Sequence, residues 1–91
     1  MDSVHAMDAP VEYFHVVSEL IRSASSQCRS MEIRPDSLLL EELKLDSLDI
    51  VRVIMLMEDR YRITVDLDEV PAMKDVADLA QLLSRQLRTA A

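Results

Sequence analysis

Four consecutive residues near the middle of the chain have the types and spacing to present a hydroxyl group for modification. Ser47 follows Asp46 and precedes Leu48, and Asp49 stands three residues after Asp46. Asp is favoured at the N-cap of a helix, and an acid three residues later is placed to complete a capping box. Ser47 would then lie in the first helical turn, where free backbone N–H groups favour a negative charge. The pattern indicates a serine that is presented to another protein and carries an anionic group.

The helix that would position Ser47 is predicted over residues 46–61. Apolar residues recur there at helical spacing and cover a wide face. A helix this apolar is buried on more than one side, or it docks a ligand or partner. Met55 and Met57 are interpreted first as core residues, although the flexible thioether of Met55 also suits contact with a ligand. The apolar set is Leu48, Val51, Ile54, Met55, Met57 and Tyr61, widened by Ile50, Val53 and Leu56.

Two further helices are predicted on either side of this one. The first runs from about residue 11, just after Pro10, to about residue 25, and the last runs from its N-cap Asp75 to about Arg88. Residues 31–45 form a long connection between the first two helices. Its leucines are too apolar for a free loop, so we expect them to pack onto the helices. They are Leu38, Leu39, Leu40 and Leu43.

The segment before the last helix has a weaker pattern. Ile63, Val65 and Leu67 alternate with polar residues, but the run is short and lacks a pairing strand, so we predict an extended loop. A short helical turn follows and is closed by Pro71. The predicted fold class is all-α, a small bundle of three main helices plus one short helix. We expect a flexible extension over residues 1–9, one domain over 10–88 and a frayed end over 89–91.

Composition excludes several classes of function. The chain has 91 residues, 49% of them apolar, and no Gly, so it lacks the residue that phosphate-binding loops and tight β-hairpins need. A net charge of −7 disfavours nucleic acid as a partner. Cys28 is the single cysteine and is interpreted as a small buried side chain. Neither Cys28 nor His5 or His15 has the neighbours of a metal or catalytic site.

The charge and the chain start give expectations about partners and location. Residues 36–70 hold ten acids and four bases, so we expect partners with basic surface patches. No apolar run approaches the length of a membrane span, and the first ten residues lack the order of a signal peptide. We therefore expect a cytoplasmic protein, whose translation starts at Met1 or at Met7.

The residues around Ser47 resemble the modification site of acyl and peptidyl carrier proteins. The resemblance runs from about residue 11 to about residue 87 and rests on the segment Asp46-Ser47-Leu48-Asp49, in phase with the apolar helix. The later segment from Tyr61 to Val65 resembles the family's aromatic-x-Ile-x-Ile pattern. The resemblance implies the acyl carrier fold, a small bundle with a long loop between helices one and two. The other matching residues are Leu43, Val51, Ile54, Met55, Met57, Glu58 and Asp59.

By this resemblance, Ser47 would carry a 4'-phosphopantetheine arm derived from coenzyme A, with Asp46 and Leu48 beside it. The arm would hold acyl or aminoacyl groups as thioesters, so the chain would be a freestanding carrier and not an enzyme. The implied partners are a phosphopantetheinyl transferase, an acyl-loading ligase or transferase, and synthases with basic docking patches. Partners would dock on Asp46, Asp49, Arg52, Glu58 and Asp59, and the slot for the bound chain would be bordered by Leu48, Val51, Met55, Ile63 and Val65.

Three features depart from the family's usual pattern. Lys44 stands where the family usually has Gly, so the turn before Ser47 must be built differently. Arg52 and Arg60 replace positions that are usually acidic in fatty-acid carriers. These changes, with the extension before residue 11, indicate a dedicated fatty-acid-like, polyketide or other secondary pathway.

Other interpretations of the sequence stay open. The chain would also fit an unmodified carrier-like adaptor or regulator, or a peptidyl or aminoacyl carrier of a nonribosomal pathway. A third alternative is a plain dimerisation domain that uses the apolar second helix, although we expect a monomer. The residues do not name the cargo.

Overall fold

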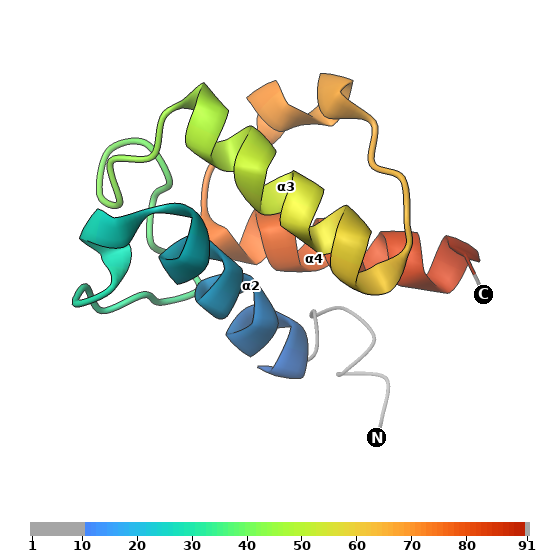
Figure 1. The fold of residues 1–91 in the computed structure, drawn as a ribbon, viewed down its shortest axis with the longest axis horizontal. Coiled ribbons are helices and arrows are strands. Elements are labelled where there is room, and N and C mark those ends of the chain that lie inside the picture. Colours follow the sequence, from blue (N-terminus) through green and yellow to red (C-terminus); the bar gives the residue numbers. More distant parts are fainter. Residues whose placement is uncertain (1–10, 91) are drawn as a thin grey trace.

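The computed structural model describes residues 11–90. In this part of the chain it contains three long helices and two short 3₁₀ helices (Figure 1). This architecture confirms the predicted all-α bundle with a long loop between its first two main helices. Residues 26–28, just beyond the predicted end of the first helix, form an additional 3₁₀ turn that was not predicted. The extension predicted over residues 1–9 lies outside the described residues. The helices are α2 (Val11–Ala24), α3 (Ser47–Tyr61) and α4 (Val76–Ala90), and the 3₁₀ helices are η1 (Ser26–Cys28) and η2 (Leu67–Ala72).

α2 joins the bundle together because it packs against both α3 and α4. Its Val17 and Ile21 are fully buried, on the face that the helical spacing predicts. Cys28, just beyond α2, is also fully buried, which confirms its interpretation as a small core side chain. The core lies where the three helices meet. Its other fully buried side chains include Val53, Ile54 and Met57 from α3, and Val76, Leu79, Leu82 and Leu83 from α4.

The long loop before α3 is tied to the start of α4. Leu38 and Asp75 form an isolated antiparallel bridge, and the Leu39 N–H donates to the Lys74 carbonyl oxygen at 2.9 Å. The first N–H groups of α4 have no partner within the helix, and loop carbonyls accept two of them. Val76 donates to Ser37 at 3.1 Å, and Ala77 donates to Pro35 at 2.8 Å. The loop therefore has a defined path despite its irregular backbone.

The leucines of this loop divide into two groups. Leu39 and Leu43 are buried in the core, as predicted, whereas Leu38 and Leu40 are exposed. The prediction was wrong for the exposed pair because neighbouring side chains of a non-helical segment cannot all point to the same side. Burial of Leu39 directs the residues before and after it toward solvent.

The segment between α3 and α4 follows its prediction in part. Ile63 and Val65 are buried in extended backbone without strand pairing, which confirms the extended loop. The short helical turn that follows is longer than predicted. η2 covers Leu67–Ala72 and includes Pro71, whereas the prediction ended the turn before this proline. The Asp66 side chain accepts a hydrogen bond from the Asp68 N–H at 2.9 Å and so caps η2.

α4 begins at the predicted cap. The Asp78 N–H donates to the Asp75 carboxylate at 3.0 Å, and the Asp75 N–H donates to the Asp78 carboxylate at 3.3 Å. This reciprocal pair satisfies backbone donors that the helix itself leaves free. The backbone of α4 continues to Ala90, two residues beyond the predicted end at Arg88.

Candidate modification site at the start of α3

Ser47 is the first residue of α3 and is exposed. Asp46 is the N-cap: its carboxylate accepts the Asp49 N–H at 2.8 Å, and the Asp49 carboxylate accepts the Asp46 N–H at 3.3 Å. This capping box confirms the predicted start of the helix. Among residues 11–90, no protein group hydrogen-bonds the Ser47 hydroxyl or the N–H groups of Ser47 and Leu48. A presented hydroxyl therefore lies beside two free backbone donors at the positive end of a helix dipole.

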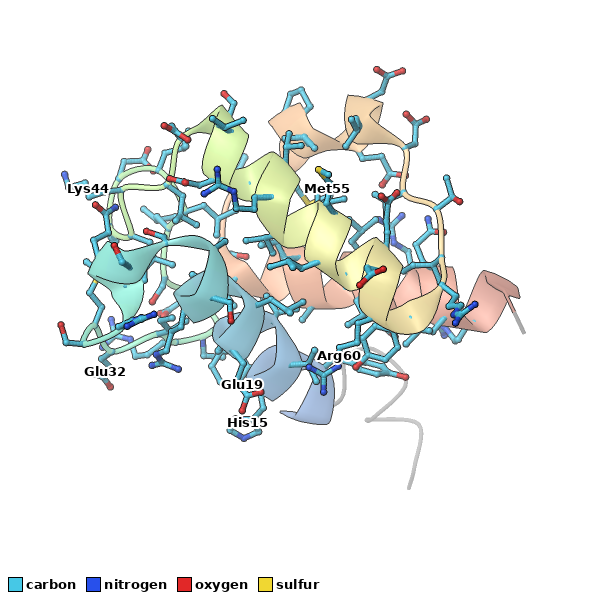
Figure 2. The ribbon with its side chains drawn as sticks, viewed as in Figure 1. His15, Glu19, Glu32, Lys44, Met55 and Arg60 are labelled. Carbon is cyan, nitrogen blue, oxygen red and sulfur yellow. The ribbon has the colours of Figure 1, made fainter. Side chains whose placement is uncertain are left out.

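The turn before Ser47 corrects the expectation for Lys44. Lys44 has a φ of 60°, the left-handed conformation that glycine adopts most readily. The turn is therefore not built differently. Lys44 itself takes the conformation that a glycine would take, and its side chain lies at the outer edge of the loop (Figure 2).

Gln27 of η1 contacts this turn and was not predicted to have a role. Its amide nitrogen donates to the carbonyl oxygens of Leu43, at 3.2 Å, and Lys44, at 3.0 Å. The Cys28 thiol also donates to the Leu43 carbonyl, at 3.6 Å. These contacts join residues 15 to 17 positions apart, and the sequence carries no local signal for them. They fix the backbone that leads into α3.

An open groove of about 750 Å³ runs along the outer side of α3. Leu48 and Met55 are 64% and 59% exposed there, so the interpretation of Met55 as a core residue was wrong, whereas Met57 is fully buried. The two methionines differ because they are two positions apart, which places them on different faces of a helix. The groove is lined by Leu48, Val51, Arg52, Met55, Leu56, Glu58 and Asp59.

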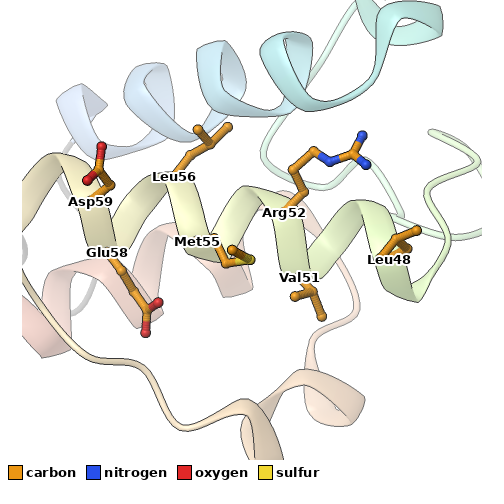
Figure 3. A pocket seen from close by; sticks show the side chains of 7 residues that line it. All are labelled: Leu48, Val51, Arg52, Met55, Leu56, Glu58 and Asp59. Carbon is orange, nitrogen blue, oxygen red and sulfur yellow. The ribbon is translucent and has the colours of Figure 1, made fainter.

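The groove contains only part of the predicted slot for a bound chain. It brings together Leu48, Val51 and Met55, but Ile63 and Val65 do not line it and are buried in the core. Figure 3 shows Val51 and Met55 directed to the side of α3 that faces the segment carrying η2.

Two of the charged residues on α3 that were predicted to dock partners, Arg52 and Glu58, have contacts within the chain itself. Arg52 donates to the carbonyl oxygen of Ala24, the last residue of α2, at 3.3 Å. The Glu58 carboxylate accepts the Val65 N–H at 2.8 Å and so holds the extended segment against α3. Asp59 is exposed at one end of the groove.

The acidic charge lies mainly beside α3 and not on it. α3 has three acids and two bases. The excess comes from the loop before α3, with Asp36, Glu41 and Glu42, and from the segment at η2, with Asp66, Asp68 and Glu69. All six are exposed except Glu69, which is half-buried and pairs with Arg85 at 3.0 Å. A partner on the α3 groove would therefore meet acidic groups at the N-terminal end of α3 and along the side of α3 that faces η2 (Figure 1).

Residues 11–90 hold no group of three or more His, Cys, Asp or Glu side chains that could bind a metal ion. None of their helices has the length and apolar character that crossing a bilayer requires. His15 lies beside Glu19 on the exposed side of α2 (Figure 2), on a different element from Ser47.

Comparison with known proteins decides the family. Residues 18–83 match the family described as Phosphopantetheine attachment site, which covers Ser47, its capping box and the groove. The chain belongs to the acyl carrier protein family. It is 35% identical over 63 residues to a probable acyl carrier protein of Caulobacter vibrioides, covering 69% of this chain and 72% of the relative. It is 34% identical over 70 residues to an acyl carrier protein of Rickettsia canadensis, covering 77% of this chain and 80% of the relative.

The cofactor of the acyl carrier family is a covalently attached 4'-phosphopantetheine arm, and the start of α3 fits this group. Attachment needs an accessible hydroxyl, and the Ser47 hydroxyl is exposed and has no hydrogen-bond partner among residues 11–90. A phosphodiester is anionic, and free N–H groups in the first turn of a helix favour an anion. The two flanking carboxylates are held in the capping box, where they bond the Asp46 and Asp49 N–H groups and leave the Ser47 hydroxyl exposed.

Proposed function

We propose that the chain carries acyl groups on a 4'-phosphopantetheine arm attached to Ser47. The observation that carries the proposal is the exposed Ser47 at the capped start of α3, whose hydroxyl has no hydrogen-bond partner in the described part of the chain. Its position inside the matched residues 18–83 supports it. Proteins of this family are carriers and not catalysts, so the chemistry of Ser47 is limited to accepting the arm.

Attachment would proceed by transfer from coenzyme A. The Ser47 oxygen forms a bond to the phosphorus next to the pantetheine part, the P–O bond to the adenosine bisphosphate part breaks, and the hydroxyl proton leaves to a base of the transferase. When bound, the arm supplies a thiol that holds an acyl group as a thioester. Asp46 and Asp49 keep the first turn of α3 intact, and the N–H groups of Ser47 and Leu48, which no group in residues 11–90 occupies, would be available to the phosphodiester.

The groove on α3 is the proposed surface for partners and cargo. Leu48, Val51 and Met55 offer apolar contact there, and the acidic residues of the loop before α3 and of the η2 segment attract a basic partner surface. Ile63 and Val65 would reach a bound chain only after α3 and the following segment separate. We therefore leave them out of the proposed surface.

The finer features of the function are proposals of the same kind. Partners would be a phosphopantetheinyl transferase, an acyl-loading ligase or transferase, and synthases with basic patches. Arg52 and Arg60 favour a dedicated pathway over general fatty-acid synthesis, because they remove acidic charge from α3. Cytoplasmic location and a monomeric state remain predictions.

The test is to incubate the protein with coenzyme A and a broad-specificity phosphopantetheinyl transferase and to measure the intact mass. We expect a gain of one phosphopantetheine group, none in Ser47→Ala, and the full gain in the control Ser30→Ala, which removes another exposed serine hydroxyl. If the wild-type chain gains no mass and Ser47→Ala still binds its partners, the chain is an unmodified adaptor instead. Self-association that depends on concentration in sedimentation would favour the dimerisation domain.

A further inference from the structure

The amide of Gln27 holds two consecutive carbonyl groups, those of Leu43 and Lys44, at 3.2 and 3.0 Å. A carbonyl oxygen only accepts hydrogen bonds, so the NH₂ group and not the amide oxygen must face the loop. The Leu43 carbonyl oxygen also accepts a hydrogen bond from the Cys28 thiol, at 3.6 Å. One short 3₁₀ turn thus supplies three contacts to one short stretch of loop.

The stretch that Gln27 holds is the one that needs support. Lys44 occupies the left-handed region with a φ of 60°, where any residue with a Cβ is disfavoured. The whole chain contains no glycine that could take such a position without cost. Local hydrogen bonds are therefore needed to keep Lys44 in this conformation.

The held stretch leads directly to Ser47. Lys44 is followed by Leu45, which is buried and donates its N–H to the Leu39 carbonyl at 2.9 Å, and then by the N-cap Asp46. If Lys44 leaves the left-handed region, the direction in which the chain enters α3 changes. The position of the first turn, and of the Ser47 hydroxyl, then changes as well.

We propose that Gln27 is a positioning residue for the modification of Ser47, because its two hydrogen bonds hold the Lys44 turn in the form that the phosphopantetheinyl transferase recognises. This inference rests on the proposed function, in which the Ser47 oxygen takes the phosphopantetheine group from coenzyme A and adenosine bisphosphate leaves. Gln27 does not touch the reacting atoms. It sets the fraction of molecules that are ready to be bound.

The proposal predicts a specific change in the kinetics of modification. An enzyme that binds only one conformer has an apparent KM that rises as the fraction of that conformer falls, while its kcat stays the same. We expect Gln27→Ala to raise the transferase KM for the carrier by about two- to fivefold, within the factor that the loss of its two hydrogen bonds allows. Gln27→Glu should raise it further, because a carboxylate repels both carbonyl oxygens.

Two variants separate positioning from general stability. In Gln27→Ala combined with Lys44→Gly, glycine adopts the left-handed conformation without support, so the KM should return toward the wild-type value. The control Ser26→Ala changes an exposed neighbour in η1 that holds neither carbonyl, and its KM should not change. Circular dichroism at the assay temperature checks that every variant in the comparison is folded.

Amide hydrogen exchange of the unmodified protein gives a second measurement that needs no transferase. The Leu45 N–H should exchange faster in Gln27→Ala than in wild type, and glycine at position 44 should slow it again. The proposal is overturned if folded Gln27→Ala and Gln27→Glu keep both the wild-type KM and the wild-type exchange rate of Leu45. It is also overturned if adding Lys44→Gly to Gln27→Ala does not lower the KM. If the wild-type chain accepts no phosphopantetheine, the proposed function is wrong. In that case the exchange rates of Leu45 still test whether Gln27 holds the Lys44 turn.

Discussion

The guanidinium of Arg52 donates a hydrogen bond to the carbonyl oxygen of Ala24, 28 residues earlier, at 3.3 Å. Ala24 ends α2, where carbonyl groups lack partners and the helix dipole favours a positive charge. Arg52 therefore links the second main helix to the end of the first. We expect Arg52→Glu to lower the free energy of unfolding by about 1 kcal/mol, because the bond is lost and the charge at the helix end is reversed. Urea denaturation measures this change, and a value equal to wild type would contradict it.

Arg52 also lines the α3 groove, so the same change bears on docking. If the native partner places an acidic group opposite Arg52, Arg52→Glu weakens that complex, and Arg52→Lys, which keeps the charge, does not. Affinities of the two variants for the native loading enzyme distinguish charge from stability. Equal affinity of Arg52→Glu and wild type would mean that this departure from the family is neutral for partners.

The left-handed Lys44 gives a stabilising substitution. Lys44→Gly should raise the free energy of unfolding by about 1 kcal/mol, because glycine adopts a positive φ without steric cost. For a domain of this size the melting temperature should rise by about 4–8 °C. Lys44→Ala is the matched control, since alanine keeps the Cβ, and it should bring no gain. A lower melting temperature for Lys44→Gly would show that the lysine side chain itself stabilises the turn.

The chain offers a matched pair of capping aspartates, Asp46 on α3 and Asp75 on α4. Alanine at either position removes a capping box and should cost about 1 kcal/mol of stability. Asp46 adjoins Ser47, whereas the start of α4 contacts the loop only at residues 35–39, so Asp46→Ala should slow phosphopantetheine transfer more than Asp75→Ala does. Thermal unfolding and the initial rate of modification test the two effects separately. Equal rates in both variants would show that the cap does not position the serine.

Met55 and Met57 provide a test of the groove against the core. Met57 is fully buried, so Met57→Ala should cost about 2–5 kcal/mol. Met55 is exposed, so Met55→Ala should change stability by less than about 0.5 kcal/mol. Urea titration of both variants decides whether α3 buries the face described. A large decrease in the free energy of unfolding for Met55→Ala would mean that the groove closes over Met55 in solution.

Features that depend on neighbouring residues could be predicted from the sequence. The start of α3, the start of α4 and the place of Ser47 follow from Asp46, Asp75 and the apolar spacing after them, because capping is a local interaction. The sequence could not show whether Met55 lies in the core or in the groove. The spacing of apolar residues shows that one face of α3 is apolar, but it does not show which part of that face another helix covers. The contacts of Gln27 and Glu58 were also missed, because they depend on segments that only the fold brings together.

The bonds from Val76 and Ala77 to the carbonyl groups of Ser37 and Pro35 join the long loop to the beginning of α4. On a growing chain, Ser47 is synthesised well before these donors are. The loop that leads to Ser47 cannot take its final path until α4 has left the ribosome and docked. The order of synthesis thus delays presentation of the serine until the whole domain is in place, so a nascent or truncated chain without α4 would make a poor substrate for modification.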